Sequence, residues 1–99
     1  MYRELAQVHP DVFRPHLATA LNNQSNRLAE LGRHAEGLPA IVEAVALRRE
    51  LAAAYPDAFR PDLAKALDNL ADTLSGLERH AEAQAAHEEA ASIRESLLS

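Results

Sequence analysis

The feature of this sequence that most constrains its fold is an internal repeat. Residues 5–50 align with residues 51–96 at an offset of 46, without insertions, and about 22 of the 46 aligned positions are identical. The segment LAQVHPDVFRPHLATALNN corresponds to LAAAYPDAFRPDLAKALDN, and LGRHAE corresponds to LERHAE. A fixed period of this length is typical of solenoids, in which each unit packs only against its neighbours. We therefore predict a single domain over residues 1–99, with the tail of a preceding repeat at 1–9, repeat 1 at 10–55 and a C-terminal capping repeat 2 at 56–99.

Each unit has the pattern of two helices. Apolar residues recur at steps of three and four along residues 63–77, which predicts one apolar stripe on a helix. Small residues follow at the complementary spacing from Ala83 to Ala90, so two helix backbones can approach closely. Three residues, Glu78-Arg79-His80, are enough only for a turn between the helices. With 3 glycines and 4% aromatic residues, the composition also favours helix over strand, and we predict an all-α fold of antiparallel helix pairs.

Prolines separate the units. We expect Pro56-Asp57 to end the preceding helix, Asp57 to cap a short turn, and Pro61 to take the first position of the next helix. The counterparts in the first unit are Pro10, Asp11 and Pro15. Pro39 lies near the second turn of its helix, where we expect a mild bend and no break, because the apolar pattern continues beyond it.

Composition and missing motifs exclude several classes of function. With a net charge of -5, the chain lacks the basic surface that nucleic-acid binding needs. It also has no Cys for a disulfide or a thiolate site. Its apolar stretches are far shorter than the roughly 20 residues of a membrane span, and no secretory signal pattern begins the chain. His80 and His87 could share a helix face, but two imidazoles seven residues apart, with no flanking carboxylate at ligand spacing, make a weak metal site. We expect a cytoplasmic protein with no enzymatic activity, metal or cofactor.

The segment ALNNQSNRLAELGRHAEGLPAIVEAVALRRE resembles a tetratricopeptide repeat, in particular the longer-period variety of kinesin light chains and large actinobacterial regulatory proteins. Leu21 and Leu28 stand at the large positions of that pattern, and Ser25, Gly37 and Ala44 at the small ones. The second unit departs from it where Glu78 replaces the turn glycine and His87 replaces an apolar residue. The resemblance implies a right-handed helical-repeat solenoid that binds a protein or peptide.

Polar residues on the first helix of each unit are the candidate binding residues, because the side opposite the leucine stripe is expected to line a concave groove. They recur at steps of three and four: Thr19, Asn22 and Asn26 in the first unit, and Lys65, Asp68 and Asp72 in the second. Asparagine offers both a donor and an acceptor to the backbone of an extended peptide, and kinesin-light-chain-like grooves imply the same use. The two aspartates would favour a basic ligand. The alternative is that these residues form only a solvated polar face.

The two ends of the repeat differ in sequence. The apolar set Leu38, Ile41, Val42 and Val45 becomes Gln84, His87, Glu88 and Ala91 in the second unit, as expected of a terminal face that no neighbour covers. At the other end Leu5 and Val8 lie on a stub too short to be a stable helix alone, and Leu17 follows on the first full helix. We therefore predict self-association through the N-terminal face, as a homodimer. The alternatives are a peptide-binding module alone, or a fragment of a longer regulatory array.

Overall fold

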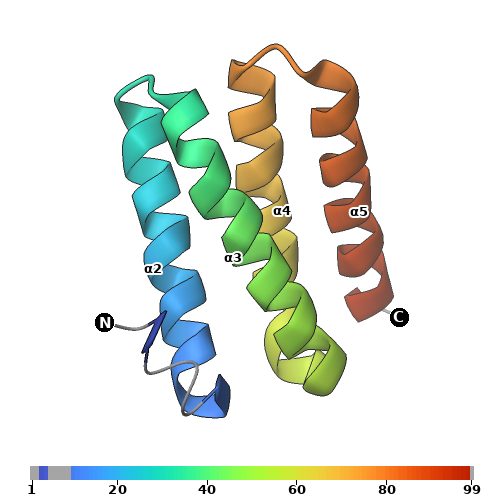
Figure 1. Cartoon of the computed structure of the whole chain (residues 1–99). Coiled ribbons are helices and arrows are strands. Elements are labelled where there is room, and N and C mark those ends of the chain that lie inside the picture. Colours follow the sequence, from blue (N-terminus) through green and yellow to red (C-terminus); the bar gives the residue numbers. More distant parts are fainter. Residues whose placement is uncertain (1–2, 5–9, 99) are drawn as a thin grey trace.

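The computed structural model of the chain describes residues 3–4 and 10–98, and its described part contains helices and turns but no strand. Four long helices follow one another: α2 (Pro10–Glu30), α3 (His34–Ala54), α4 (Pro56–Gly76) and α5 (His80–Leu98). Each helix packs against the next one in the sequence, and α2 also touches α4 (Figure 1). This arrangement confirms the predicted all-α fold of a helical repeat. None of the helices in the described part is long and apolar enough to cross a membrane.

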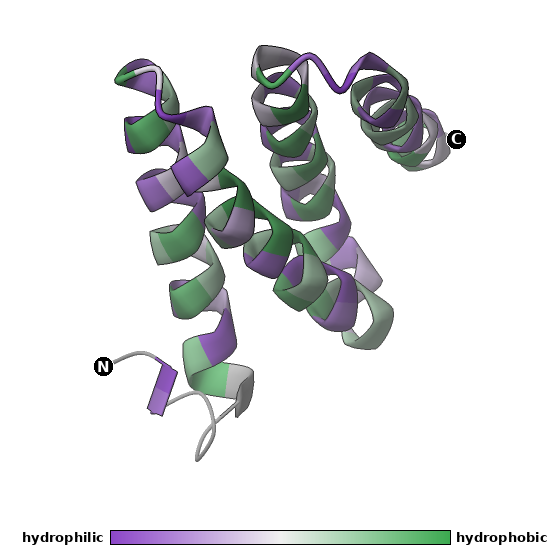
Figure 2. Ribbon diagram, turned by 45° about the horizontal axis from the view of Figure 1, so that its top comes forward, coloured by the Kyte–Doolittle hydropathy of each residue, from purple (hydrophilic) through white to green (hydrophobic). Residues whose placement is uncertain are grey.

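The core lies on both sides of α3, which is coloured largely green where it lies between α2 and α4 (Figure 2). Leu17 and Leu21 of α2 pack against Ile41 at one side of α3. Leu63 and its neighbours on α4 pack against Val45 at the other side. A single residue of α4, Leu70, contacts all three apolar clusters of the chain. Burial of these aliphatic side chains holds each helix to the next, since each contributes roughly 1.5–3 kcal/mol when fully buried.

Both turns within the helix pairs have the same geometry. The amide of Arg33 donates to the carbonyl of Leu28, and the amide of Gly32 to that of Ala29, at 2.8 and 2.9 Å. Equivalent bonds at 2.9 and 3.0 Å close the second turn around Glu78. This is the Schellman motif, whose central residue adopts the left-handed conformation. Gly32 has φ 73° and Glu78 has φ 62°, so the second unit keeps a turn that glycine would adopt without strain.

The prediction for the prolines at the unit boundaries is wrong in part. Pro56 starts α4, whose preceding residue is Tyr55, and Pro61 lies inside the helix rather than at its first position. Pro15 likewise lies inside α2, which begins at Pro10. A proline six residues into a helix removes one backbone bond, and packing of Phe59 against the core helps to hold the first turn despite that loss. Pro39 lies within an unbroken α3, as expected.

An ion pair repeats with the period of the sequence. Arg49 in the C-terminal part of α3 pairs with Glu89 of α5, and Arg3 pairs with Glu43 of α3 in the same way. The guanidinium of Arg49 donates to both carboxylate oxygens of Glu89, and this contact lowers the pKa of Glu89 below its ordinary value. Arg3 therefore takes the place relative to α3 that Arg49 takes relative to α5.

Candidate functional site

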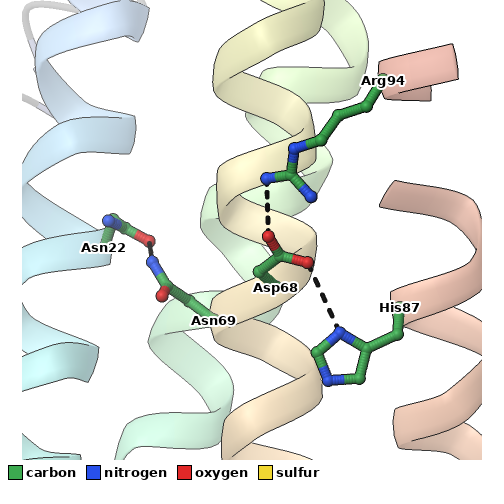
Figure 3. A network of polar contacts seen from close by, with 5 residues as sticks. All are labelled: Asn22, Asp68, Asn69, His87 and Arg94. Carbon is green, nitrogen blue, oxygen red and sulfur yellow. Dashed lines mark hydrogen bonds and ion pairs between the residues drawn. The ribbon is translucent and has the colours of Figure 1, made fainter. Parts of the chain in front are cut away.

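A pair of asparagine side chains joins the first helices of the two units. Nδ2 of Asn69 on α4 donates a hydrogen bond of 2.8 Å to Oδ1 of Asn22 on α2, and both side chains are half-buried (Figure 3). One bond of this kind uses one donor of one amide and one acceptor of the other. The NH₂ group of Asn22 and the oxygen of Asn69 keep hydrogen-bonding capacity that this contact does not use.

Sequence reasoning selected Asn22 but missed Asn69. The repeat aligns Asn69 with Asn23 and Asn22 with Asp68, so the pair joins two positions that do not correspond to each other. Helices α2 and α4 run in the same direction, because the antiparallel helix α3 separates them in the chain (Figure 1). The signal available for Asn69 was that it directly precedes Leu70 of the predicted stripe and aligns with another asparagine, Asn23.

A second set of polar contacts connects α2 with α4 through an arginine of α3. Nη2 of Arg48 donates to Oγ1 of Thr19 on α2 at 2.9 Å, and its Nη1 lies 3.7 Å from a carboxylate oxygen of Asp62 on α4. The Arg48 side chain is only 11% exposed, so its charge is held between the helices by these two partners. Thr19, a predicted binding residue, therefore takes part in holding the two units together.

Asp68, another predicted binding residue, faces α5. Its carboxylate accepts a hydrogen bond of 2.6 Å from Nη2 of Arg94, and Nδ1 of His87 lies 3.5 Å from its other oxygen (Figure 3). The hydrogen bond from Arg94 is the main reason that the pKa of Asp68 lies below its ordinary value. Asp68 is therefore anionic at neutral pH and is held in one orientation.

The other three predicted residues, Asn26, Lys65 and Asp72, are exposed and form no hydrogen bond or ion pair with another described residue. Asn26 lies one turn beyond Asn22, and Asp72 lies about one turn beyond Asn69 in the same direction. Lys65 lies one turn before Asn69 and Thr19 about one turn before Asn22. With the Asn22–Asn69 bond as the middle row, this spacing places six residues of α2 and α4 in three rows, which we call the α2–α4 surface: Thr19 and Lys65, Asn22 and Asn69, Asn26 and Asp72.

The residues predicted for self-association are placed differently. Leu5 and Val8 lie outside the described residues. Leu17 is buried in the apolar cluster between α2 and α3, so α3 covers it and no second copy is needed for its burial. The homodimer remains a prediction.

A surface cavity of about 440 Å³ opens at the other end of the helix array. The end of α4 and one face of α5 line it, with His80, Ala83, Gln84, His87, Glu88 and Ala91 on the α5 side. These include all four residues that the sequence singled out as the exposed replacements of an apolar face. Within the described part of the chain, no group of three or more acidic or histidine side chains is arranged to hold a metal ion.

Comparison with known proteins identifies one family. Residues 63–99, which run from within α4 through α5, match the model of the tetratricopeptide repeat. No curated protein and no solved structure matches the chain. The matched segment contains the apolar stripe of α4, the turn at Glu78 and the small-residue face of α5. Residues 63–99 are thus similar to a tetratricopeptide repeat, and they lie in an all-helical array whose first helix pair has the same sequence pattern.

Proposed function

We propose that this chain is a non-enzymatic protein-binding module that holds an extended, basic peptide segment of its partner on the α2–α4 surface. Tetratricopeptide repeats mediate protein–protein interactions, and the family match supports that general role. The observation that carries the finer proposal is the Asn22–Asn69 pair, which places two amide groups side by side across the boundary between the units.

The amide pair has the chemistry to bind a peptide backbone. An extended peptide presents N–H and C=O groups, and the NH₂ of Asn22 and the oxygen of Asn69 can serve one of each. Because the two side chains already hold each other, less side-chain entropy is lost on binding than for two free asparagines. Asn26 adds a third amide one turn further along α2.

The charges around the amides favour a basic side chain near one end of the surface. Asp72 is exposed and unpaired within the described residues, whereas Asp68 already binds Arg94 and His87. A lysine or arginine of the peptide would meet the Asp72 carboxylate, and Lys65 is available to a peptide carboxylate about two turns away. This contact is exposed, so we expect it to weaken as salt is added.

The proposal is tested by selecting peptides from a random unstructured library on the parent chain and measuring their affinity by fluorescence anisotropy. The variant Asn26→Ala/Asp72→Ala removes two exposed side chains that have no partner among the described residues, so its fold should be unchanged. We expect selected peptides to bind this variant at least tenfold more weakly, in line with the loss of one or two hydrogen bonds to charged or amide groups.

A matched control is Ser92→Ala/Ser96→Ala, which removes two exposed polar side chains from α5, away from the α2–α4 surface. Peptide affinity should be unchanged in this control. If the selected peptides bind the Asn26→Ala/Asp72→Ala variant as tightly as the parent chain, the α2–α4 surface is not the binding site.

A further inference from the structure

The cavity at the end of α5 has a counterpart inside the molecule. The offset of 46 residues places Gln84, His87 and Ala91 of α5 on Leu38, Ile41 and Val45 of α3. In the first unit that face is covered: Leu38 and Ile41 pack against Leu70 of α4, and Val45 lies in the cluster with other α4 residues. The contact between α3 and α4 therefore shows how one helix lies on this face.

The side chains on the wall of this cavity differ from those on the covered face of α3. Ala91 is shorter than the Val45 that it replaces, and His87 points toward Asp68 (Figure 3). Glu88 takes the place of Val42 and is exposed on the same wall, where it accepts a hydrogen bond of 3.1 Å from Gln84. The wall thus combines alanine surface with carboxylate and amide groups.

We propose that this cavity docks one α-helix of a partner protein, with an aliphatic side chain at the place of Leu70 and a basic side chain at the place of Asn69. Leu70 is the α4 residue that fills the equivalent space against α3. The basic side chain is required because of the bond between Asn69 and Asn22. The counterpart of Asn22 in the second unit is Asp68, so the side chain at the Asn69 place would meet a carboxylate there. A helix that lies on α5 as α4 lies on α3 brings its corresponding side chain to that carboxylate.

The charges of the site agree with a basic side chain at the Asn69 place of the docked helix. Asp68 uses one oxygen for Arg94 and the other for a longer contact to His87, and a carboxylate has about four acceptor positions. Glu88 adds a second carboxylate beside the cavity, and the whole chain has a net charge of -5. A cation at the Asn69 place is therefore attracted both by the nearest carboxylate and by its surroundings.

A second copy of this chain does not meet these requirements. The helix that would have to dock is α2, which carries Gln24 at the place of Leu70 and Glu30 at the place of Gly76. Gly76 is needed in the α3–α4 contact, since a Cβ atom there would lie 2.6 Å from the ring of His34. The two copies would also overlap. If α2 of the second copy lay on α5, its Arg3 would fall on residue 95 of the first copy, because residues 3 and 95 both align with Arg49 in the repeat.

The test uses fluorescent peptides copied from residues 55–77 of this chain, titrated into the full chain at low salt. The probe carries Asn69→Lys, and the first control peptide keeps Asn69. A second control peptide combines Asn69→Lys with Leu70→Gln, which is the residue that α2 has at this place. We expect the probe to bind, and each control peptide to bind at least tenfold more weakly.

Variants of the full chain show where the probe binds. Ala91→Arg fills the cavity and repels the added lysine, whereas Ser92→Arg adds the same charge at the next exposed residue, which does not line the cavity. The first variant should weaken the probe at least tenfold and the second should not. Absence of probe binding, equal binding of the three peptides, or equal binding to Ala91→Arg would overturn the proposal.

Sedimentation equilibrium of the chain alone tests the other possible occupant of the cavity, a second copy of this chain. We expect Ala91→Arg to leave the mass of the chain unchanged, both for a monomer of 10.8 kDa and for a dimer formed through the N-terminal face. A dimer that Ala91→Arg dissociates would mean that a second copy fills the cavity, and the partner helix proposed here would then be wrong. Failure of this proposal leaves the α2–α4 surface untouched, because none of its residues is altered in these variants.

Discussion

Replacing Glu78 with glycine should stabilise the protein. Glu78 is the central residue of the turn between α4 and α5, with φ 62°, and its exposed side chain forms no hydrogen bond or ion pair with a described residue. A non-glycine residue in the left-handed region costs about 1–2 kcal/mol. Glycine loses about 0.5–1 kcal/mol of this gain through its greater freedom in the unfolded chain. The net stabilisation expected for Glu78→Gly is therefore about 0.5–1 kcal/mol.

The first unit supplies the reverse experiment. Gly32 has φ 73°, and a Cβ atom placed on it would meet no other atom within 4 Å. Gly32→Glu therefore tests the cost of the backbone conformation without a steric clash, and it should destabilise by about the same 0.5–1 kcal/mol. Glu30→Gly makes the same exchange in the last residue of α2 and should also destabilise, by up to about 1 kcal/mol.

Urea denaturation followed by far-ultraviolet circular dichroism measures all three changes. For a domain of this size, 1 kcal/mol shifts the melting temperature by about 4–8 °C, so thermal melts should resolve them as well. If Glu78→Gly leaves the stability unchanged or lowers it, while Glu30→Gly lowers it as expected, the strain assigned to this turn is absent.

Three further changes test the core and the polar contacts. Leu74→Ala should cost about 2–5 kcal/mol in urea denaturation because Leu74 is buried with Ala71, and a small loss would mean that the leucine stripe does not face the core. Ser25→Ala should stabilise by about 1 kcal/mol, since the buried Ser25 hydroxyl has no partner among the described residues and Ala71 takes this place in the second unit. Asp68→Asn should destabilise at neutral pH, because Asp68 binds Arg94 as an anion. Since the pKa of Asp68 is lowered on folding, this difference should be complete above about pH 5 and vanish as the pH falls below about 3.9, whereas a pH-independent difference would exclude the charge as its cause.

The sequence predicted the helices and their pairing because both depend on a strong period. The spacing of Leu63, Leu67 and Leu74 defines one helix face, and the structure buries all three residues. The shared turn geometry at Gly32 and Glu78 also follows from the repeat, since aligned positions should have the same backbone. Local rules failed at Pro61, where packing of the residues before the proline outweighs the loss of one hydrogen bond.

The candidate site was harder to predict because it depends on contacts between the units. The repeat aligns Asn22 with Asp68, yet Asn22 bonds to the next unit while Asp68 bonds within its own helix pair. Which partner each residue finds depends on whether another helix follows, and a single aligned pattern does not contain that information. The burial of Leu17 also depends on a contact with another helix, α3, so the sequence at the start of the chain did not reveal it.

The central claim is that a basic peptide binds across α2 and α4 through side-chain amides. Nuclear magnetic resonance of ¹⁵N-labelled protein tests it directly, because every asparagine and glutamine side chain gives its own NH₂ signals. On addition of a selected basic peptide, we predict the largest shifts at Asn22, Asn26 and Asn69, with little change at Gln84 in the cavity of α5. Shifts confined to Gln84 and its neighbours, with the three asparagines unchanged, would contradict the account.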